Sequence, residues 1–204
     1  MSLNRKPVIL QKDISQTAIM KKIAVFASGN GSNFEAIAQA CADGRLEAEV
    51  ALMVCDKPGA YVNERAERLG IPAFTFSPQD YSGKSEYETI IADKLDSLGV
   101  ELVCLAGYMR IVGDELLSRY QGRIINIHPS LLPAFQGAQA VERAVEYGVK
   151  VYGITIHWVD QTLDGGKIIA QEAFRYDGHD PEEVHALGQV IEHRLYVDTI
   201  RQLL

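Results

Sequence analysis

The chain has 204 residues, of which 47% are hydrophobic and 23% are charged, the composition of an ordinary globular protein. Its formal net charge is −7, so we expect neither nucleic acid nor an anionic membrane as a partner. No apolar run approaches the roughly 20 residues that a membrane span needs. The three cysteines are widely spaced and form no CxxC pair, which favours free thiols in a reducing, cytoplasmic compartment.

The first 19 residues are set apart from the remainder by their composition. They contain a short apolar run but neither the hydrophobic region nor the cleavage site of a signal peptide. Met20 stands directly before the first strong strand pattern. We therefore interpret residues 1–19 as an N-terminal extension or a segment added for expression, and residues 20–204 as a single domain.

Strand and helix patterns alternate from residue 21 to about residue 147. Short apolar runs predict strands, and amphipathic stretches that end at glycine predict helices. The predicted strands are 21–28, 48–55, 72–76, 101–106 and 123–127, and the predicted helices are 34–41, 60–69, 87–98 and 113–120. This alternation indicates an α/β protein with an open, mostly parallel twisted sheet and helices on both faces.

The pattern changes after residue 150. Residues 151–159 alternate in part, and a second apolar run (IIAQEAF) follows after a turn. These two runs predict an antiparallel extension of the sheet. Residues 180–203 predict a helix, because Asp180-Pro181-Glu182-Glu183 supplies an N-cap, a proline at the first position and acids in the first turn.

A glycine-rich loop, GNGSN at residues 29–33, follows the first predicted strand. Ligands of open α/β sheets bind at the carboxyl ends of the strands, and a helix N-terminus offers free N–H groups to an anion. The loop is therefore a candidate phosphate site. Phe34 replaces the third glycine of the dinucleotide fingerprint, and no Gly-Lys-Ser/Thr follows as in a P-loop. A plain glycine turn remains the alternative.

Asn126 and His128 stand two residues apart at the end of a predicted strand, so their side chains point the same way. An amide beside an imidazole suits oxyanion stabilisation and proton transfer. The alternative is a buried polar pair that the neighbouring backbone satisfies.

Asp164 lies in the segment DQTLDGG between the two late strands. If it reaches His128, its carboxylate would hold the imidazole in the charged form and fix its orientation. The alternative is a surface turn, where Asp-Gly is common. His157 is expected to be a packed residue on its strand or a residue that supports the catalytic side chains from behind. No HxH, HExxH or cysteine cluster occurs, so we predict no metal.

Taken together, GNGSN, LAGYMRIV, NIHPSLLP and DQTLDGG resemble the folate-dependent formyltransferases with their Rossmann-like fold, in order and in spacing. GNGSN narrows the resemblance to the glycinamide ribonucleotide formyltransferases of purine biosynthesis. The resemblance runs from about Met20 to Leu204. It implies transfer of a formyl group from the cosubstrate 10-formyltetrahydrofolate to the amine of glycinamide ribonucleotide, by a monomer or homodimer whose partners are small molecules.

The resemblance also implies roles for individual residues. The catalytic residues would be Asn126, His128 and Asp164. The acceptor would be bound by Gly31, Ser32, Asn33, Gln189, Val190, Ile191 and Glu192. The folate would be bound by Lys84, Met109, Arg110, Ile111, Val112, Asp160, Gln161, Thr162 and Leu163. The family often has proline where this chain has Gln136, so the resemblance does not imply the path of the loop around Gln136.

Four other functions are weighed against this one. A methionyl-tRNA formyltransferase would need a basic tRNA-binding extension, which this acidic chain lacks. A 10-formyltetrahydrofolate deformylase usually carries an N-terminal regulatory domain, for which residues 1–19 are too short. A noncatalytic nucleotide-binding module would leave Asn126, His128 and Asp164 without a shared role. Phe34 argues against a dinucleotide-dependent oxidoreductase.

Overall fold

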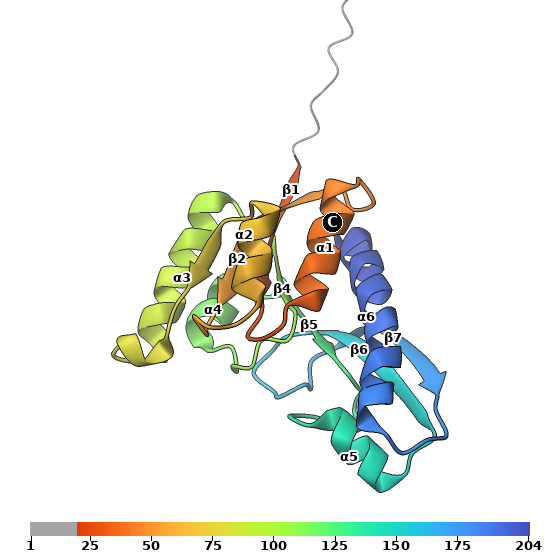
Figure 1. Ribbon diagram of the computed structural model, residues 1–204. Helices are drawn as coiled ribbons and strands as arrows, with labels where there is room; N and C mark the ends of the chain where they lie inside the picture. Colours follow the sequence, from red (N-terminus) through yellow and green to blue (C-terminus); the bar gives the residue numbers. More distant parts are fainter. Residues whose placement is uncertain (1–19) are drawn as a thin grey trace, which may run out of the picture.

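The computed structural model describes residues 20–204, so the predicted N-terminal segment 1–19 lies outside the described residues. Over residues 20–204 the chain forms seven strands, all in one sheet (Figure 1). The strands are β1 (Lys21–Phe26), β2 (Ala48–Cys55), β3 (Ala73–Thr75), β4 (Leu102–Leu105), β5 (Ile124–His128), β6 (Val151–Trp158) and β7 (Ile168–Arg175). The helices are α1 (Ser32–Ala42), α2 (Val62–Leu69), α3 (Lys84–Leu98), α4 (Asp114–Arg119), α5 (Ala140–Tyr147) and α6 (Pro181–Leu203), and a short 3₁₀ helix spans Pro78–Asp80.

The strand order in the sheet is β3-β2-β1-β4-β5-β6-β7. The first five strands are parallel, and β6 and β7 are antiparallel to their neighbours. The predicted open, mostly parallel sheet with a late antiparallel extension is therefore confirmed. All four residues of β4 are buried, as expected for a central strand covered on both faces, whereas no residue of the edge strand β7 is fully buried.

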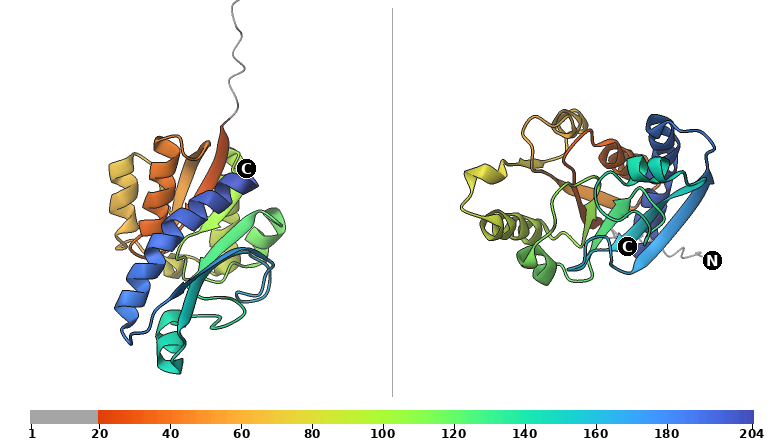
Figure 2. Two further views of the ribbon diagram at one scale, coloured as in Figure 1. Left: turned by 90° about the vertical axis from the view of Figure 1, so that its right-hand side faces the viewer. Right: turned by 90° about the horizontal axis from the view of Figure 1, so that it is seen from below.

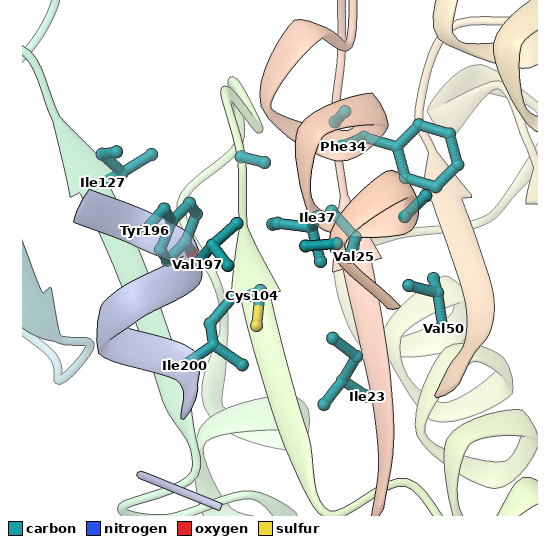
Figure 3. Close-up of a cluster of buried hydrophobic side chains, with 14 of the residues drawn as sticks. Ile23, Val25, Phe34, Ile37, Val50, Cys104, Ile127, Tyr196, Val197 and Ile200 are labelled. Carbon is teal, nitrogen blue, oxygen red and sulfur yellow. The ribbon is translucent and has the colours of Figure 1, made fainter. Parts of the chain in front are cut away.

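The sheet separates two hydrophobic layers. Helices α1, α2 and α6 cover one face, and α3 and α4 cover the other, as the right-hand view of Figure 2 shows. Figure 3 shows the first layer, where Phe34 and Ile37 of α1 and Tyr196 of α6 pack over β1 and β4. Cys55 and Cys104 are buried in this layer as free thiols, as the sequence predicts.

Two helices begin earlier than the sequence pattern predicts, and one has no predicted counterpart. Helix α1 begins at Ser32, because Gly31 adopts a φ of 77° and turns the chain directly into the helix. Helix α3 begins at Lys84. Helix α5 is short and follows a left-handed Gln139 without a side-chain cap, so the sequence gives no start signal for it. No helix between residues 20 and 204 has the length and apolar character needed to cross a bilayer.

Candidate functional site

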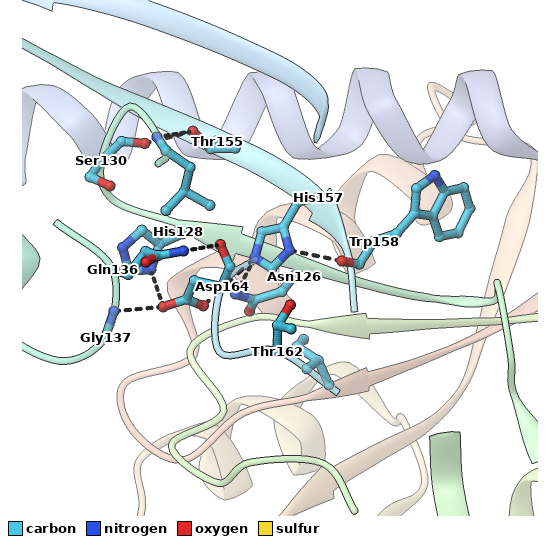
Figure 4. Close-up of polar contacts among 12 residues, drawn as sticks. Asn126, His128, Ser130, Gln136, Gly137, Thr155, His157, Trp158, Thr162 and Asp164 are labelled. Atoms are coloured by element: carbon cyan, nitrogen blue, oxygen red, sulfur yellow. Dashed lines mark hydrogen bonds and ion pairs between the residues drawn. The ribbon is translucent and has the colours of Figure 1, made fainter. Parts of the chain in front are cut away.

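The loops that follow β1, β2, β4 and β5 emerge at the carboxyl edge of the parallel strands, because parallel strands all end on the same side. The order of strands reverses between β1 and β4, where the chain goes first to one side of β1 and then to the other. Open α/β sheets bind their ligands at such a reversal. The loop between β6 and β7 reaches the same edge (Figure 4).

Strand β5 delivers Asn126 and His128 to this edge, and β6 lies antiparallel beside it. In the register of these two strands Asn126 is opposite His157, and His128 is opposite Thr155. The Asn126 amide nitrogen lies 3.1 Å from Nε2 of His157. Nδ1 of His157 lies 2.9 Å from the Trp158 carbonyl, which can only accept, so Nδ1 carries a proton. In the neutral ring Nε2 then accepts from Asn126, which fixes the orientation of the amide.

Both ring nitrogens of His128 face oxygen acceptors. Nε2 is 2.9 Å from the carbonyl oxygen of Phe135, and Nδ1 is 3.4 Å from Oδ2 of Asp164. A neutral imidazole has a single N–H and satisfies only one of these acceptors, whereas an imidazolium donates to both. The ring is buried, so the adjacent carboxylate is screened little by solvent.

The carboxylate of Asp164 lies between the two histidines (Figure 4). Oδ1 is 3.7 Å from Nε2 of His157, and Oδ2 accepts from the Gly137 N–H at 2.7 Å. A hydrogen bond donated by Nε2 of His157, which requires the protonated ring, lowers the pKa of Asp164 most; burial opposes this, and the Gly137 N–H and the charge of His128 lower the pKa further. The carboxylate is therefore ionised at neutral pH.

Gln136 connects the loop after β5 to the loop that carries Asp164. Its amide donates to the Asp164 carbonyl at 3.1 Å. Phe135 and Asp164 both adopt positive φ values, of 55° and 47°, which side-chain-bearing residues seldom do. The two loops therefore hold each other through Gln136, Gly137 and Asp164.

The 109–112 segment follows β4 and is held at both ends. The Met109 N–H donates to the Ser28 hydroxyl at 2.8 Å, and the Ser28 hydroxyl donates to Asp56. Arg110 pairs with the other oxygen of the same buried Asp56 at 2.9 Å. At the far end, the Gly113 N–H donates to Glu88 at 2.7 Å.

The side chains of this segment divide between the surface and the core. Met109 is 72% exposed and Ile111 is 65% exposed, whereas Val112 is buried in the layer under α3 and α4. Lys84, at the start of α3, donates to the Ile111 carbonyl at 2.9 Å. The structure thus brings Lys84 to the 109–112 segment, although the two are 27 residues apart.

The GNGSN loop meets α6. Gln189 donates to the Ser32 hydroxyl at 2.8 Å, and the Asn33 amide donates to Glu192 at 2.7 Å. The side-chain oxygen of Asn33 is buried and has no partner among the described residues. Val190 points to solvent and Ile191 packs against the core, so Gln189 and Glu192 are the two of these four α6 residues that contact the loop.

The 160–163 part of the β6–β7 loop is stabilised locally. Asp160 accepts from the Thr162 N–H at 2.8 Å and from the Thr162 hydroxyl, and these bonds lower its pKa. Leu163 is exposed. Gly166 lies so close to β6 that an added Cβ would be 1.8 Å from the Trp158 carbonyl oxygen, which explains the second glycine of LDGG.

A cavity of about 700 Å³ lies over the ends of β1, β2 and β3. It is lined by residues 28–30, 56–61 and 77–79 together with Arg110. Asn126, His128 and Asp164 do not line it, so the polar cluster at the end of β5 is a separate feature of the same edge. Residues 20–204 contain no group of three or more metal-binding side chains.

Of the two alternatives for His157, packing or support of the site, the structure favours the second, because His157 lies within 3.1 Å of Asn126 and 3.7 Å of Asp164. Sequence reasoning missed Arg65. Arg65, on α2, donates to the backbone and the side chain of Asn30 in the GNGSN loop. The partial alternation of β6 indicates which face His157 occupies, but the sequence contains no signal for its register against β5.

The fold and the edge described above define a class: a doubly wound α/β protein with a polar site at the carboxyl ends of its strands. The sequence profile described as "Formyl transferase" matches residues 21–200. The chain belongs to the formyl transferase family, and the resemblance to that family is confirmed.

Individual relatives agree with this assignment. The chain is 54% identical over 186 residues to a phosphoribosylglycinamide formyltransferase of Bacillus subtilis, which covers 91% of this chain and 95% of that protein. It is 40% identical over 178 residues to the Haemophilus influenzae protein of the same name, covering 87% of this chain and 84% of that one. The crystal structure of glycinamide ribonucleotide transformylase 1 from Geobacillus kaustophilus superposes with a TM-score of 0.88 at 48% identity, covering 91% and 99% of the two chains.

Proposed function

We propose that this chain is a cytoplasmic phosphoribosylglycinamide formyltransferase. It transfers the formyl group of 10-formyltetrahydrofolate to the amine of glycinamide ribonucleotide in the synthesis of IMP. The observation that carries the proposal is that Asn126 and His128 end the same strand at the carboxyl edge and that Asp164 lies 3.4 Å from His128, in a chain 54% identical to a protein of that name. The enzyme works as a monomer or homodimer on small-molecule substrates.

The reaction begins with attack of the neutral amine on the formyl carbon, which gives a tetrahedral oxyanion. The free N–H of the Asn126 amide and an N–H of His128 stabilise that charge, and removal of one such donor costs about 2.7–4 kcal/mol. Asp164, 3.4 Å from Nδ1 of His128, orients the ring and stabilises the positive charge that it carries when it donates to the oxyanion. The bond between the formyl carbon and the folate nitrogen then breaks, and the proton lost by the amine passes to that nitrogen. Because both reactants are bound together, proximity supplies much of the rate.

The contacts of His128 add one requirement to this scheme. Its Nε2 is engaged by the Phe135 carbonyl and its Nδ1 by Asp164. The formyl oxygen therefore takes the place of the Phe135 carbonyl at Nε2, while Nδ1 stays against Asp164. Phe135 would therefore move when 10-formyltetrahydrofolate binds.

The remaining contacts follow from the three loops at the edge. The acceptor phosphate binds the N–H groups of Gly31, Ser32 and Asn33, and the rest of the acceptor lies against α6 at Gln189 and Glu192, with Val190 and Ile191 in the same turn. The folate lies between the 109–112 segment and residues 160–163. Lys84 supports the folate site through its bond to Ile111. No metal takes part in this scheme.

The test is formyl transfer by the purified protein, followed through the absorbance of the deformylated folate. One reaction contains 10-formyltetrahydrofolate and glycinamide ribonucleotide, and a second omits the acceptor. We expect turnover only with acceptor, and a loss of about 10²-fold or more in His128→Ala. Turnover without acceptor would instead identify a deformylase. Absence of turnover in both reactions would contradict the proposal.

A further inference from the structure

We propose that Arg65 is a positioning residue that shapes the GNGSN loop for the phosphate of the acceptor. This inference rests on the proposed function, because it deepens the role of the loop in that reaction. Arg65 lies in the second turn of α2, outside every segment that the family resemblance assigns to a ligand. Its side chain is only 14% exposed, so its contacts are fixed by the fold.

The guanidinium of Arg65 holds one loop residue at two points. Nε donates to the Asn30 carbonyl at 2.8 Å, and Nη2 donates to the Asn30 side-chain oxygen at 2.9 Å. The remaining nitrogen pairs with Glu35 of α1. A planar fork that donates in parallel to two acceptors fixes direction as well as distance, which a lysine cannot do.

Helix α2 also holds the residues on either side of Asn30. The Val62 N–H donates to the Gly29 carbonyl at 3.1 Å. Gly31 packs against Val62 so closely that an added Cβ would lie 2.4 Å from Cγ2 of that valine. Three consecutive loop residues are therefore held against α2.

The contacts with α2 determine the direction of the backbone carbonyl groups of the loop. A loop binds an anion when its N–H groups face the ligand, and any carbonyl that turned toward the anion would repel it. The carbonyls of Gly29 and Asn30 are both occupied by donors of α2. The N–H groups at the start of α1 are thereby left for the phosphate.

The charges around the loop give Arg65 a second effect. The loop has no cation of its own, and the carboxylate of Glu192 contacts Asn33 at its edge. Burial lowers the pKa of His193, the neighbouring basic group on α6, so this histidine is neutral at pH 7. Arg65 and Arg68 share the single carboxylate of Glu35, which leaves one net positive charge behind the loop.

The experiment compares Arg65→Met with Arg68→Met. The two arginines share Glu35, but only Arg65 touches the loop. Each variant is assayed with glycinamide ribonucleotide and with the same acceptor lacking its phosphate. For Arg65→Met we expect a rise of about tenfold or more in KM for the phosphorylated acceptor, which corresponds to 1.4 kcal/mol. We expect kcat and the folate KM to stay within about twofold, and the unphosphorylated acceptor to be unaffected.

Arg65→Lys keeps the positive charge but loses the planar guanidinium, and it should raise the KM for the phosphorylated acceptor less than Arg65→Met does. Circular dichroism and the Tm of each variant serve as the check on folding. The inference is overturned if Arg68→Met raises KM equally, or if Arg65→Met weakens both acceptors by the same factor.

Calorimetry with ribose 5-phosphate separates this inference from the proposed function. If the wild-type chain fails to transfer formyl groups but binds ribose 5-phosphate, weaker binding by Arg65→Met alone supports the inference, and equal binding contradicts it. A wild-type chain that neither reacts nor binds ribose 5-phosphate would overturn both.

Discussion

The amide of Asn126 is oriented by a residue from the neighbouring strand. His157 accepts one of its N–H groups, and the Trp158 carbonyl fixes which nitrogen of His157 can do so. The second N–H of the amide then remains for a bound oxygen. The same Nε2 lies 3.7 Å from Oδ1 of Asp164, to which it can donate only when the ring is protonated.

His157→Phe should test this restraint, because phenylalanine fills the space of the ring but accepts no hydrogen bond. We expect kcat to fall by about tenfold or more, since oxyanion stabilisation depends on the direction of the donor. Both KM values should change by less than about twofold. Steady-state kinetics would measure this, with the exposed His185→Phe as the control. An unchanged kcat would show that Asn126 needs no such support.

Asp164→Asn should affect both turnover and the pH dependence of stability. Loss of the negative charge beside His128 should lower kcat by about 10²-fold or more. The folded-state pKa of Asp164 lies below the usual value of 3.8, so its ionised form stabilises the fold above that pH. This contribution is lost as the pH falls through the lower, folded-state pKa.

Thermal unfolding between pH 6 and pH 2.5 would therefore show a smaller loss of Tm for Asp164→Asn than for the wild type. Parallel curves for the two proteins would mean that Asp164 makes no net stabilising interaction in its ionised form. Turnover within a few-fold of wild type would exclude its support of His128.

At the scale of elements, α3 supports the 109–112 segment through two side chains on one of its faces. Lys84 and Glu88 are one helical turn apart, and they reach the Ile111 carbonyl and the Gly113 N–H. Gly113 fits here because a Cβ would lie 2.6 Å from Lys84 Cδ and 2.7 Å from an oxygen of Glu88. The start of α3 thus determines where the segment runs.

Glu88 is a buried carboxylate with one oxygen that has no partner among the described residues. Burial raises its pKa above 4.5, against the opposing effects of the Gly113 N–H and Lys84. The folded state therefore binds this proton more tightly than the unfolded state, and stability falls as the pH rises through the folded-state pKa.

Glu88→Gln keeps an acceptor for Gly113 without the charge, so it should raise Tm at pH 7, by on the order of 2 °C. The difference should shrink at pH 4, where Glu88 gains its proton. Calorimetry at the two pH values would measure this, with the exposed Glu86→Gln for comparison. A lower Tm at pH 7 would mean that the ionised carboxylate stabilises the segment.

At the scale of the whole molecule, α6 joins the last part of the chain to the first. Its Gln189 and Glu192 contact Ser32 and Asn33 across 157 and 159 residues of sequence. Further along, Tyr196 is fully buried, and its hydroxyl donates to the Leu105 carbonyl at 2.9 Å, at the end of β4. The helix is therefore anchored at the centre of the sheet.

Tyr196→Phe should remove this anchor without opening a cavity. A buried carbonyl that loses its donor costs about 1–3 kcal/mol, which lowers Tm by roughly 2–4 °C for each kcal/mol in a chain of this size. Kinetic constants should stay within about twofold. Differential scanning calorimetry would measure the change, and an unchanged Tm would show that the hydroxyl contributes nothing net.

The sequence by itself determined the architecture and the family. Apolar runs that alternate with amphipathic stretches predict a parallel sheet covered on both faces, because only strands buried on both sides are apolar throughout. The start signal at Asp180 located α6 to within a residue. The motifs, from GNGSN to DQTLDGG, indicated the family that the sequence profile over residues 21–200 confirms.

Only the tertiary structure decided how those motifs meet. The pairing of Asn126 with His157 depends on the register of β5 against β6, and a shift of one residue would turn His157 to the other face. The contact of Arg65 with Asn30 depends on how α2 packs against the loop, across 35 residues. Such contacts join residues far apart in the chain, and their energies depend on the sheet order and packing, which no local pattern of side chains encodes.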